Sequence, residues 1–192
     1  MKSDIKWYVL RVRYGQGLKA SITLKESGFE IYYPPHKYRK WVDGRLRTIV
    51  EPLLPSFIFV HSSIKALNTI FDKKPLLYHQ VRFFRNRTKE SDETGLNPPL
   101  FVQDKQMLNF QNVVKVEIDK NDYGAGLVGS HTRVNYSYKV GDMVRIKRGP
   151  YMGVEGRVAR IHGQQRVVVE IPGICRYATQ YVATPLLEPI KD

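Results

Sequence analysis

The chain has 192 residues, 42% of them hydrophobic, which is enough to bury one large core or two small ones. Its 31 lysines and arginines outnumber 18 acidic residues, and this formal charge of +13 indicates a polyanionic partner: nucleic acid, membrane headgroups or an acidic complex. One cysteine excludes an intramolecular disulfide, and no signal sequence or run of eighteen apolar residues is found, so a cytoplasmic protein without membrane contact is expected.

The first elements follow from the spacing of apolar residues. Trp7 to Arg13 alternates with period two, which predicts a strand with one buried face. Gln16 to Ser27 fits both a strand and a helix, and Gly28 after it favours the helix as a residue that ends one. Gly15-Gln16-Gly17 imitates a dinucleotide fingerprint, but the acidic residue expected twenty positions on is missing, so no nucleotide cofactor is predicted.

A short strand over residues 29–33 and a hairpin are expected next. Asp43-Gly44 is typical of a tight type I′ turn between arms 36–42 and 45–50. The arms are crowded with basic residues, namely Lys37, Arg39, Lys40, Arg45 and Arg47. These charges fit a solvated arm, and they equally fit a finger close to nucleic acid.

The most apolar stretch begins after Pro52 and Pro55, which lack the N–H that a strand ladder needs, so a strand is predicted over residues 56–60. Its side chains alternate: Phe57 and Phe59 share one face, and residues 58 and 60 share the other. Both faces are apolar. Such a strand is either covered on both sides or presents one face to a partner, and the residues alone favour the first interpretation.

Further along, Ser62 or Ser63 can cap a helix, residues 81–84 resemble a strand, residues 86–99 a loop, and Asp104 caps another helix. Residues 115–139 lack apolar periodicity and contain scattered glycines, which predicts a flexible linker between domains at 1–114 and 140–190. In the second domain, strands are expected over 143–147, 154–161, 166–171 and 181–182. So many short strands are typical of a small SH3-like barrel.

Motifs for chemistry are missing. The five histidines are scattered without a metal-ligand spacing, and Cys175 has no second cysteine, so neither a metal nor a cofactor is expected. No nucleophile elbow, phosphate-binding loop or paired carboxylates are found, which argues against an enzyme.

With both halves in view, the chain resembles the NusG family of transcription elongation factors, in which an NGN domain, a linker and a KOW domain follow one another. The matching runs are Trp7-Tyr8-Val9-Leu10, the signature from Pro52 to Val60, Val81-Arg82-Phe83, and the KOW run from Val140 to Val158. Residues 38–45 and the ending from Arg166 to Glu188 look more like the specialised antitermination paralogues RfaH, LoaP and the UpxY proteins of capsular polysaccharide operons. The implied fold class is α+β, an α/β sandwich followed by an all-β barrel.

The resemblance also implies binding sites. The family's pocket for the clamp helices of the RNA polymerase β′ subunit falls on Leu54, Phe57 and Phe59, which reverses the core interpretation of the two phenylalanines. The contact with the β-subunit gate loop falls on Ser63, Lys65 and Ala66, where the His-Thr-Thr run of RfaH is missing. Contact with non-template DNA is implied for basic and polar residues around the first helix and a neighbouring edge: Arg13, Gln16, Lys19, Lys73 and Lys74.

The implied mechanism is binding without chemistry. A monomeric factor that binds the closed polymerase clamp better than the open one would disfavour pausing and termination. Partners of the KOW domain in the family include Rho, a ribosomal protein and nascent RNA. The competing hypothesis is a ribosome-associated, RNA-binding KOW protein, which accounts for the charge and the barrel but leaves the NGN-like half unexplained.

Overall fold

The computed structural model describes residues 5–87, 89–91, 93, 95–120, 126–127 and 142–190. The chain forms two compact units, of which the first comprises Met1–His36 and Val50–Asp104 and the second comprises Lys37–Ile49 and Lys105–Asp192. The mixed helix and sheet content, with a barrel after an α/β half, confirms the predicted fold class.

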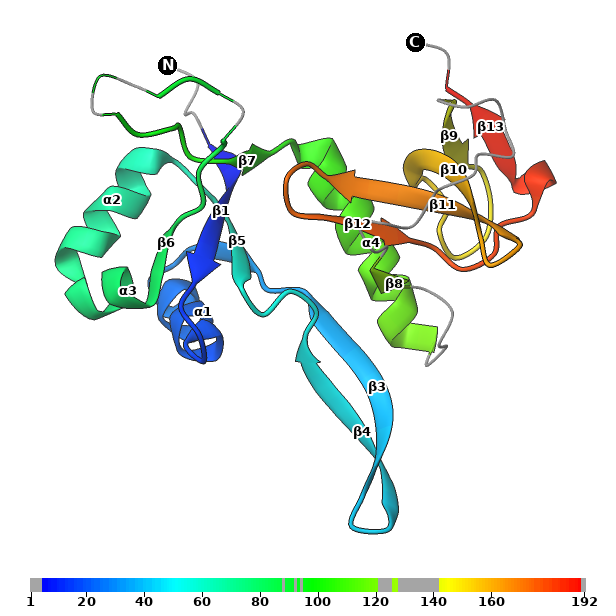
Figure 1. Cartoon of the computed structure of the whole chain (residues 1–192), viewed down its shortest axis with the longest axis horizontal. Helices are drawn as coiled ribbons and strands as arrows, with labels where there is room; N and C mark the ends of the chain where they lie inside the picture. Colours follow the sequence, from blue (N-terminus) through cyan, green and yellow to red (C-terminus); the bar gives the residue numbers. More distant parts are fainter. Residues whose placement is uncertain are drawn as a thin grey trace. The chain divides into compact units, whose positions relative to one another are not determined.

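The first unit is built on one antiparallel sheet of five strands that differ in length (Figure 1). Its strands are β1 (Lys6–Val12), β2 (Glu30–Tyr32), β5 (Phe57–Ser62), β6 (Val81–Phe83) and β7 (Phe101–Val102). Their order is β2-β5-β1-β6, with β7 also pairing with β1. β6 pairs with the end of β1 at Leu10 to Val12, and β7 pairs with its beginning at Trp7 and Tyr8. The apolar strand predicted after Pro55 is therefore central, between β2 and β1.

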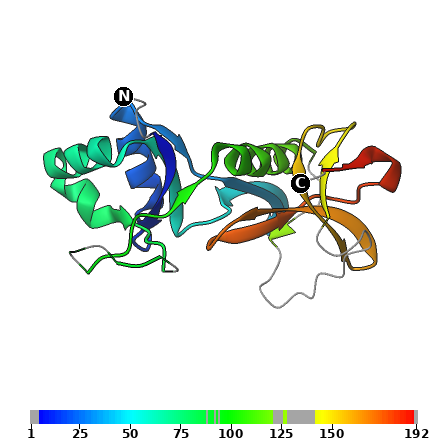
Figure 2. The same cartoon turned by 90° about the horizontal axis from the view of Figure 1, so that it is seen from above.

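Three helices cover one face of this sheet (Figure 2). They are α1 (Gly17–Glu26), α2 (Ile64–Lys73) and α3 (Pro75–Gln80). Their buried residues Ala20, Leu24, Leu67, Phe71 and Leu77 form one core cluster with alternate residues of β1 and β5. The ambiguous segment after Gly15 is thus a helix, and Gly28 follows it with a positive φ of 85°. Leu18 and Ile22, which are four residues apart, both lie on the exposed side of this helix.

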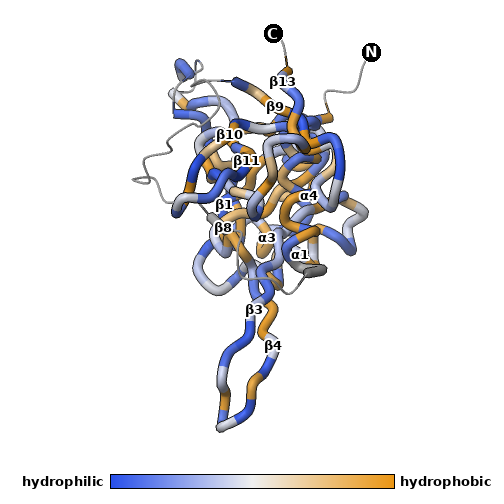
Figure 3. Tube along the Cα trace, turned by 90° about the vertical axis from the view of Figure 1, so that its right-hand side faces the viewer, coloured by the Kyte–Doolittle hydropathy of each residue, from blue (hydrophilic) through white to orange (hydrophobic). Residues whose placement is uncertain are grey.

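A two-stranded sheet of its own, β3 (Pro35–Val42) with β4 (Arg45–Pro52), forms the predicted hairpin. Asp43 and Gly44 have φ values of 50° and 71°, as a type I′ turn requires. In Figure 3, β3 is mostly hydrophilic, whereas hydrophobic and hydrophilic residues interleave along β4. The Asp43-Gly44 pair therefore identified the turn of this hairpin from the sequence.

The linker prediction is wrong at its start. Helix α4 (Asp104–Lys120) continues past residue 115, because Val113 and Val114 are buried and Glu117 binds a tyrosine of the barrel. Within the predicted linker, Gly126–Leu127 also forms a short strand, β8, that pairs with Tyr177 and Ala178. The remaining linker residues, 121–125 and 128–139, lie outside the described residues.

The second unit holds a strongly curved sheet of six strands in the order β13-β9-β10-β11-β12-β8. Its further elements are β9 (Met143–Ile146), β10 (Glu155–Ile161), β11 (Gln164–Ile171), β12 (Cys175–Ala178), the 3₁₀ helix η1 (Thr184–Leu186) and β13 (Leu187–Pro189). Three predicted strands are confirmed, but residues 181–182 are not a strand. The strand that pairs with β11 lies earlier in the chain, at Cys175 to Ala178. The backbone N–H of Val182 donates one hydrogen bond to the carbonyl of Gln165, outside the regular pairing of strands.

None of the helices in the described part of the chain is both long and apolar enough to cross a membrane.

Candidate functional site

Strand β5 divides its side chains between two faces, as the sequence predicts. Ile58 and Val60 belong to the core cluster under the helices. Phe57 and Phe59 point to the opposite face. Phe59 is nevertheless 0% exposed, and its ring lies 6.4 Å from that of Tyr32 on the neighbouring strand. Phe57, at the start of the strand, is only half-buried.

The three residues implied as a polymerase pocket therefore do not form one open surface. Leu54 and Phe59 are buried, and their implied contact with the clamp helices stays a prediction. Phe57 alone is partly accessible, and its ring packs edge-on against Phe84 with centroids 5.1 Å apart. Sequence reasoning missed Phe84, whose position next to Phe57 depends on pairing between distant strands.

Phe57 stands at one end of a row that crosses three neighbouring strands. Arg11 of β1 pairs with Phe57 on one side and with Arg82 of β6 on the other. Residues directly opposite in antiparallel strands project to the same face, so an aromatic ring and two guanidinium groups lie side by side at this end of the sheet. This Phe57–Arg11–Arg82 row joins an apolar surface to a basic one.

The basic part of the row continues into an open groove of about 460 Å³. Its lining includes Arg11, Arg13 and Arg82 together with Tyr14 and His79, and no acidic residue is among the residues that line it. Arg13 is placed by its own backbone, whose N–H donates to the carbonyl of Gln80 at 2.8 Å. Three arginines without a carboxylate between them create a strongly positive concavity, which suits phosphate groups. Arg11 and Arg82 were missed as site residues, although the period-two spacing of Arg11 and Arg13 was visible.

The other cations implied for DNA contact differ in availability. Arg13, Lys19 and Lys73 are exposed, and Gln16 precedes α1 without making a side-chain cap. Lys74 is committed to the fold instead: its Nζ donates to the Ser27 hydroxyl at 2.9 Å, and that hydroxyl donates to the carbonyl of Thr23 at 2.6 Å. Lys74 therefore links the end of α1 to the start of α3, and its implied contact with DNA stays a prediction.

The gate-loop candidates lie at the beginning of α2. Ser63 is the N-cap residue, since its hydroxyl accepts a hydrogen bond from the backbone N–H of Ala66 at 3.2 Å. The prediction that Ser62 or Ser63 caps this helix is confirmed for Ser63. Lys65 is exposed in the first turn. Ser63 thus has a structural task that is independent of any partner.

A second polar cluster on the sheet surface was not predicted. The Trp7 and His61 rings stack with centroids 4.9 Å apart, and Nδ1 of His61 lies 2.8 Å from a carboxylate oxygen of Glu30. Asp104 lies 3.8 Å from the other ring nitrogen. The sequence treats His61 as an isolated residue, because its partners come from three separate segments.

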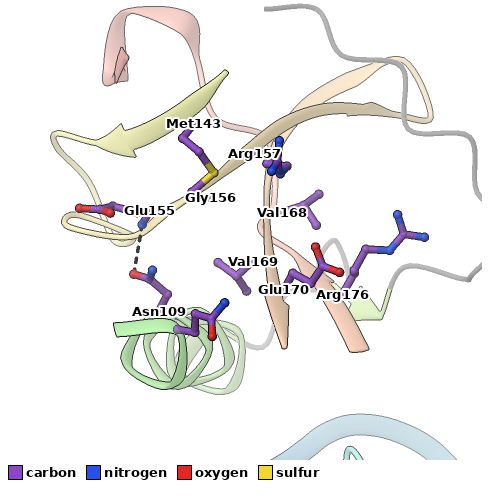
Figure 4. Close-up of a pocket in the computed structure, with 10 residues that line it drawn as sticks. Asn109, Met143, Glu155, Gly156, Arg157, Val168, Val169, Glu170 and Arg176 are labelled. Carbon is purple, nitrogen blue, oxygen red and sulfur yellow. Dashed lines mark hydrogen bonds between the residues drawn. The ribbon is translucent and has the colours of Figure 1, made fainter. Parts of the chain in front are cut away.

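In the second unit, α4 packs on the barrel around Glu155, the first residue of β10 (Figure 4). The backbone N–H of Glu155 donates to Oδ1 of Asn109 at 3.1 Å. Its carboxylate, 8% exposed, receives Lys105 at 2.6 Å and Arg145 at 2.7 Å. Burial raises the pKa of Glu155, but the hydrogen bonds from Lys105 and Arg145 outweigh it and hold the pKa below its usual value.

A hydroxyl network lies further along the same helix. Tyr151 donates to the Glu117 carboxylate, and accepts from the backbone N–H of Gln180 at 3.2 Å. Burial and the bond to Glu117 raise the pKa of Tyr151. The ring of Phe110 meets Tyr177 edge-on at 5.9 Å. Between helix and barrel, a cavity of about 250 Å³ carries Arg157 and Arg176 on its walls.

The described residues offer little for catalysis. Burial raises the pKa of the Cys175 thiol to about 12, so the thiolate needed for nucleophilic chemistry is scarce at neutral pH. Among the described residues, no group of three His, Cys, Asp or Glu side chains could hold a metal ion. What the first unit does present is an aromatic and arginine surface suited to binding.

Comparison with known families agrees with this arrangement. Residues 5–111 match the family model described as transcription termination factor nusG, and residues 140–170 match the KOW motif. No curated protein matches the chain. The first match spans more than half of the 192 residues and contains the whole sheet, and the second covers β9, β10 and most of β11. An NGN domain followed by a KOW domain is the order of a family of non-enzymatic transcription factors that interact with RNA polymerase, and the chain belongs to it: it is a member of the NusG family.

Proposed function

We propose that this NusG-family protein is a specialised antitermination factor that binds the β′ clamp helices of RNA polymerase through the surface around Phe57 and supports processive transcription of particular operons, capsular polysaccharide operons among them. The single observation that carries the proposal is that Phe57, at the end of its strand, is only half-buried, whereas Phe59 and Val9 on the same face of the sheet are buried. An aromatic side chain left partly open beside a basic groove is a natural anchor for a partner.

The Phe57–Arg11–Arg82 row supports a two-part contact. The aromatic end takes up the apolar surface of a polymerase helix, while the arginine groove with Arg13 faces the phosphates of the non-template strand. Lys19 and Lys73 extend this charge. Each phosphate contact adds to affinity in a salt-dependent way, so the DNA part should weaken as ionic strength rises.

The gate-loop contact is the smaller part of the proposal. Lys65 is exposed and available to the β subunit, whereas Ser63 is already engaged as a cap. The factor acts by holding the clamp closed. Since it has no reaction to catalyse, its effect on the polymerase equals the difference between its affinities for the closed and the open clamp.

The test compares two neighbouring residues of β5. Phe57→Ser should leave the domain folded, because the side chain is half-exposed, and should weaken capture of RNA polymerase about 30- to 1000-fold, as the loss of about 2 to 4 kcal/mol at an aromatic anchor implies. Ile58→Ser is the matched control. Its side chain is fully buried under the helices, so a hydroxyl there should lower the free energy of unfolding by about 3 to 5 kcal/mol.

Melting temperature and polymerase pull-down from lysate are measured for both variants. Phe57→Ser that melts as early as Ile58→Ser, or that captures polymerase at the wild-type level, contradicts the proposal. Co-sedimentation of the wild-type protein with ribosomal subunits in place of polymerase would favour the ribosome-associated alternative.

A further inference from the structure

The β3–β4 hairpin carries an exposed aromatic surface that the proposed polymerase contact does not use. The two-residue turn at Asp43 and Gly44 joins the strand ends Val42 and Arg45, so Trp41 lies opposite Leu46. Trp41 is 69% exposed and Leu46 is 49% exposed. Because most of its indole ring is in contact with water, Trp41 contributes little to the stability of the fold and is available to a ligand.

Cations surround this pair. On the same face, two positions further from the turn, exposed Arg39 stands opposite exposed Thr48. The opposite face carries exposed Lys40 opposite exposed Arg47. Between residues 37 and 49 there are five lysines and arginines and one acidic residue, Asp43. Close to its turn, the hairpin is therefore a positive ribbon with one exposed aromatic ring, that of Trp41, and the aliphatic side chain of Leu46 next to it.

This combination decides among ligand classes. A stable protein interface needs an apolar core far larger than one tryptophan and one leucine. A membrane-surface element needs a continuous apolar face, whereas Arg39 interrupts this one. Single-stranded nucleic acid needs only what is present: a ring on which an unpaired base can stack, and cations spaced along an extended backbone for the phosphates.

We propose that the Trp41 face of the β3–β4 hairpin binds single-stranded DNA, with a base stacked on the Trp41 and Leu46 pair and a flanking phosphate held by Arg39 on the same face. The assignment to DNA rests on the proposed function, which places an unpaired DNA strand next to this protein. The stacking and charge argument rests on the hairpin alone.

The chain suits a direct optical test, because it has two tryptophans and Trp7 is buried. Adding an oligothymidylate of ten nucleotides to the full-length protein should quench tryptophan emission, and Trp41→Phe should abolish most of that quenching. In anisotropy titrations of the labelled oligonucleotide, Trp41→Ala should weaken binding about 5- to 100-fold, the usual range for one stacked base. The salt dependence of binding should stay the same, since no cation is lost.

Arg39→Ala should act differently. It should lower the slope of log affinity against log salt by about 0.7, the value for one phosphate contact on a single strand. Tyr181→Ala and Lys115→Ala, which alter an exposed aromatic ring and an exposed cation elsewhere, are the matched controls and should change neither quantity. Circular dichroism should show all five variants folded.

Three results would overturn the inference: binding of the oligonucleotide without quenching, wild-type affinity of Trp41→Ala, or quenching by oligouridylate with none by oligothymidylate, which would assign the surface to RNA. Polymerase pull-down separates this inference from the proposed function. Trp41→Ala should still capture polymerase, whereas Phe57→Ser should lose capture and keep the quenching.

Discussion

The two units close their interiors by different means. In the first, alternate side chains of β1 and β5 meet three helices, and the shared core cluster is made of apolar and aromatic residues. In the second, two strands of the barrel approach closely at Gly156, where the backbone of Val168 leaves no space for a Cβ, and a charged group, the carboxylate of Glu155, is buried as well. A layer of helices can shift to absorb a change in side-chain volume, but a barrel wall has no such freedom. Substitutions that add volume should therefore cost more in the barrel than in the sheet.

The largest effect is expected for Gly156→Ala in β10. A Cβ at this position would collide with the carbonyl oxygen of Val168 on the neighbouring strand and with Cγ1 of Val167. The colliding oxygen belongs to the backbone, so the ladder between β10 and β11 would have to separate. We expect a loss of about 3 kcal/mol or more in the free energy of unfolding of the barrel, at or above the usual cost of overpacking.

Thermal unfolding followed by circular dichroism measures this loss, and Gly163→Ala is the matched control. Gly163 has a positive φ of 77° but open space where a Cβ would be, so alanine there adds only backbone strain of about 1 to 2 kcal/mol. Equal melting temperatures for the two variants would contradict this prediction, because they would show that β10 and β11 can make room for a Cβ at position 156 at little cost in stability.

The contrast between the units also explains what the sequence could and could not predict. Period-two alternation identified β1 and β5, and Asp43-Gly44 identified the hairpin, because these signals are local. Helix α3 was missed, since six residues are too few to display a helical period. The continuation of α4 was missed because its stability comes from contacts with the barrel, such as that of Glu117 with Tyr151.

The candidate site, too, has one part that the local sequence pattern predicted and another part that it could not predict. The sequence predicted which face Phe57 occupies, because alternation decides it. It could not predict that Arg11 lies between Phe57 and Arg82, since that row requires the register of residue pairs about 46 and 71 positions apart in the sequence. It could not predict that Lys74 is engaged with Ser27 either, for the same reason.

A smaller effect on stability is expected for Glu155→Gln, which tests how much the buried carboxylate contributes to the stability of the second unit. The substitution keeps the shape of the side chain but removes the charge that Lys105 and Arg145 share. Loss of a charge-assisted bond at a buried site should lower the free energy of unfolding by about 1 to 3 kcal/mol at neutral pH. Glu188→Gln, at a more exposed carboxylate 3.6 Å from Arg145, is the control and should change it by less than about 1 kcal/mol.

The contribution of Glu155 to the free energy of unfolding should depend on pH in a definite direction. The pKa of Glu155 is lower in the folded protein than its ordinary value of 4.5, so its contribution is fully present above about pH 4.5. The contribution is lost as the pH falls through the folded-state pKa. Chemical unfolding at pH 7 and at pH 3 should therefore show a gap between wild type and Glu155→Gln that narrows at the lower pH. A gap that widens on acidification would contradict the ion-pair account.

The smallest effect is expected in the first unit, for Ser63→Ala at the beginning of α2. Removing the hydroxyl leaves the N–H of Ala66 without its cap, which should lower the free energy of unfolding by about 1 kcal/mol. Thr69→Ala in the same helix is the control. Its hydroxyl bonds back to the carbonyl of Lys65 at 2.9 Å on an exposed face, and alanine is the better helix former, so this change should be neutral or stabilising by about 0.5 kcal/mol.

Ser63→Asp separates the cap from any contact with polymerase. A carboxylate caps as well as a hydroxyl and favours the positive end of the helix, so the variant should be as stable as the wild type in urea unfolding. If Ser63 acts only as a cap, Ser63→Asp should also capture polymerase normally. Full stability with lost capture would instead place this side chain in the contact itself. The aromatic anchor at Phe57 would then share the interface with the first turn of α2.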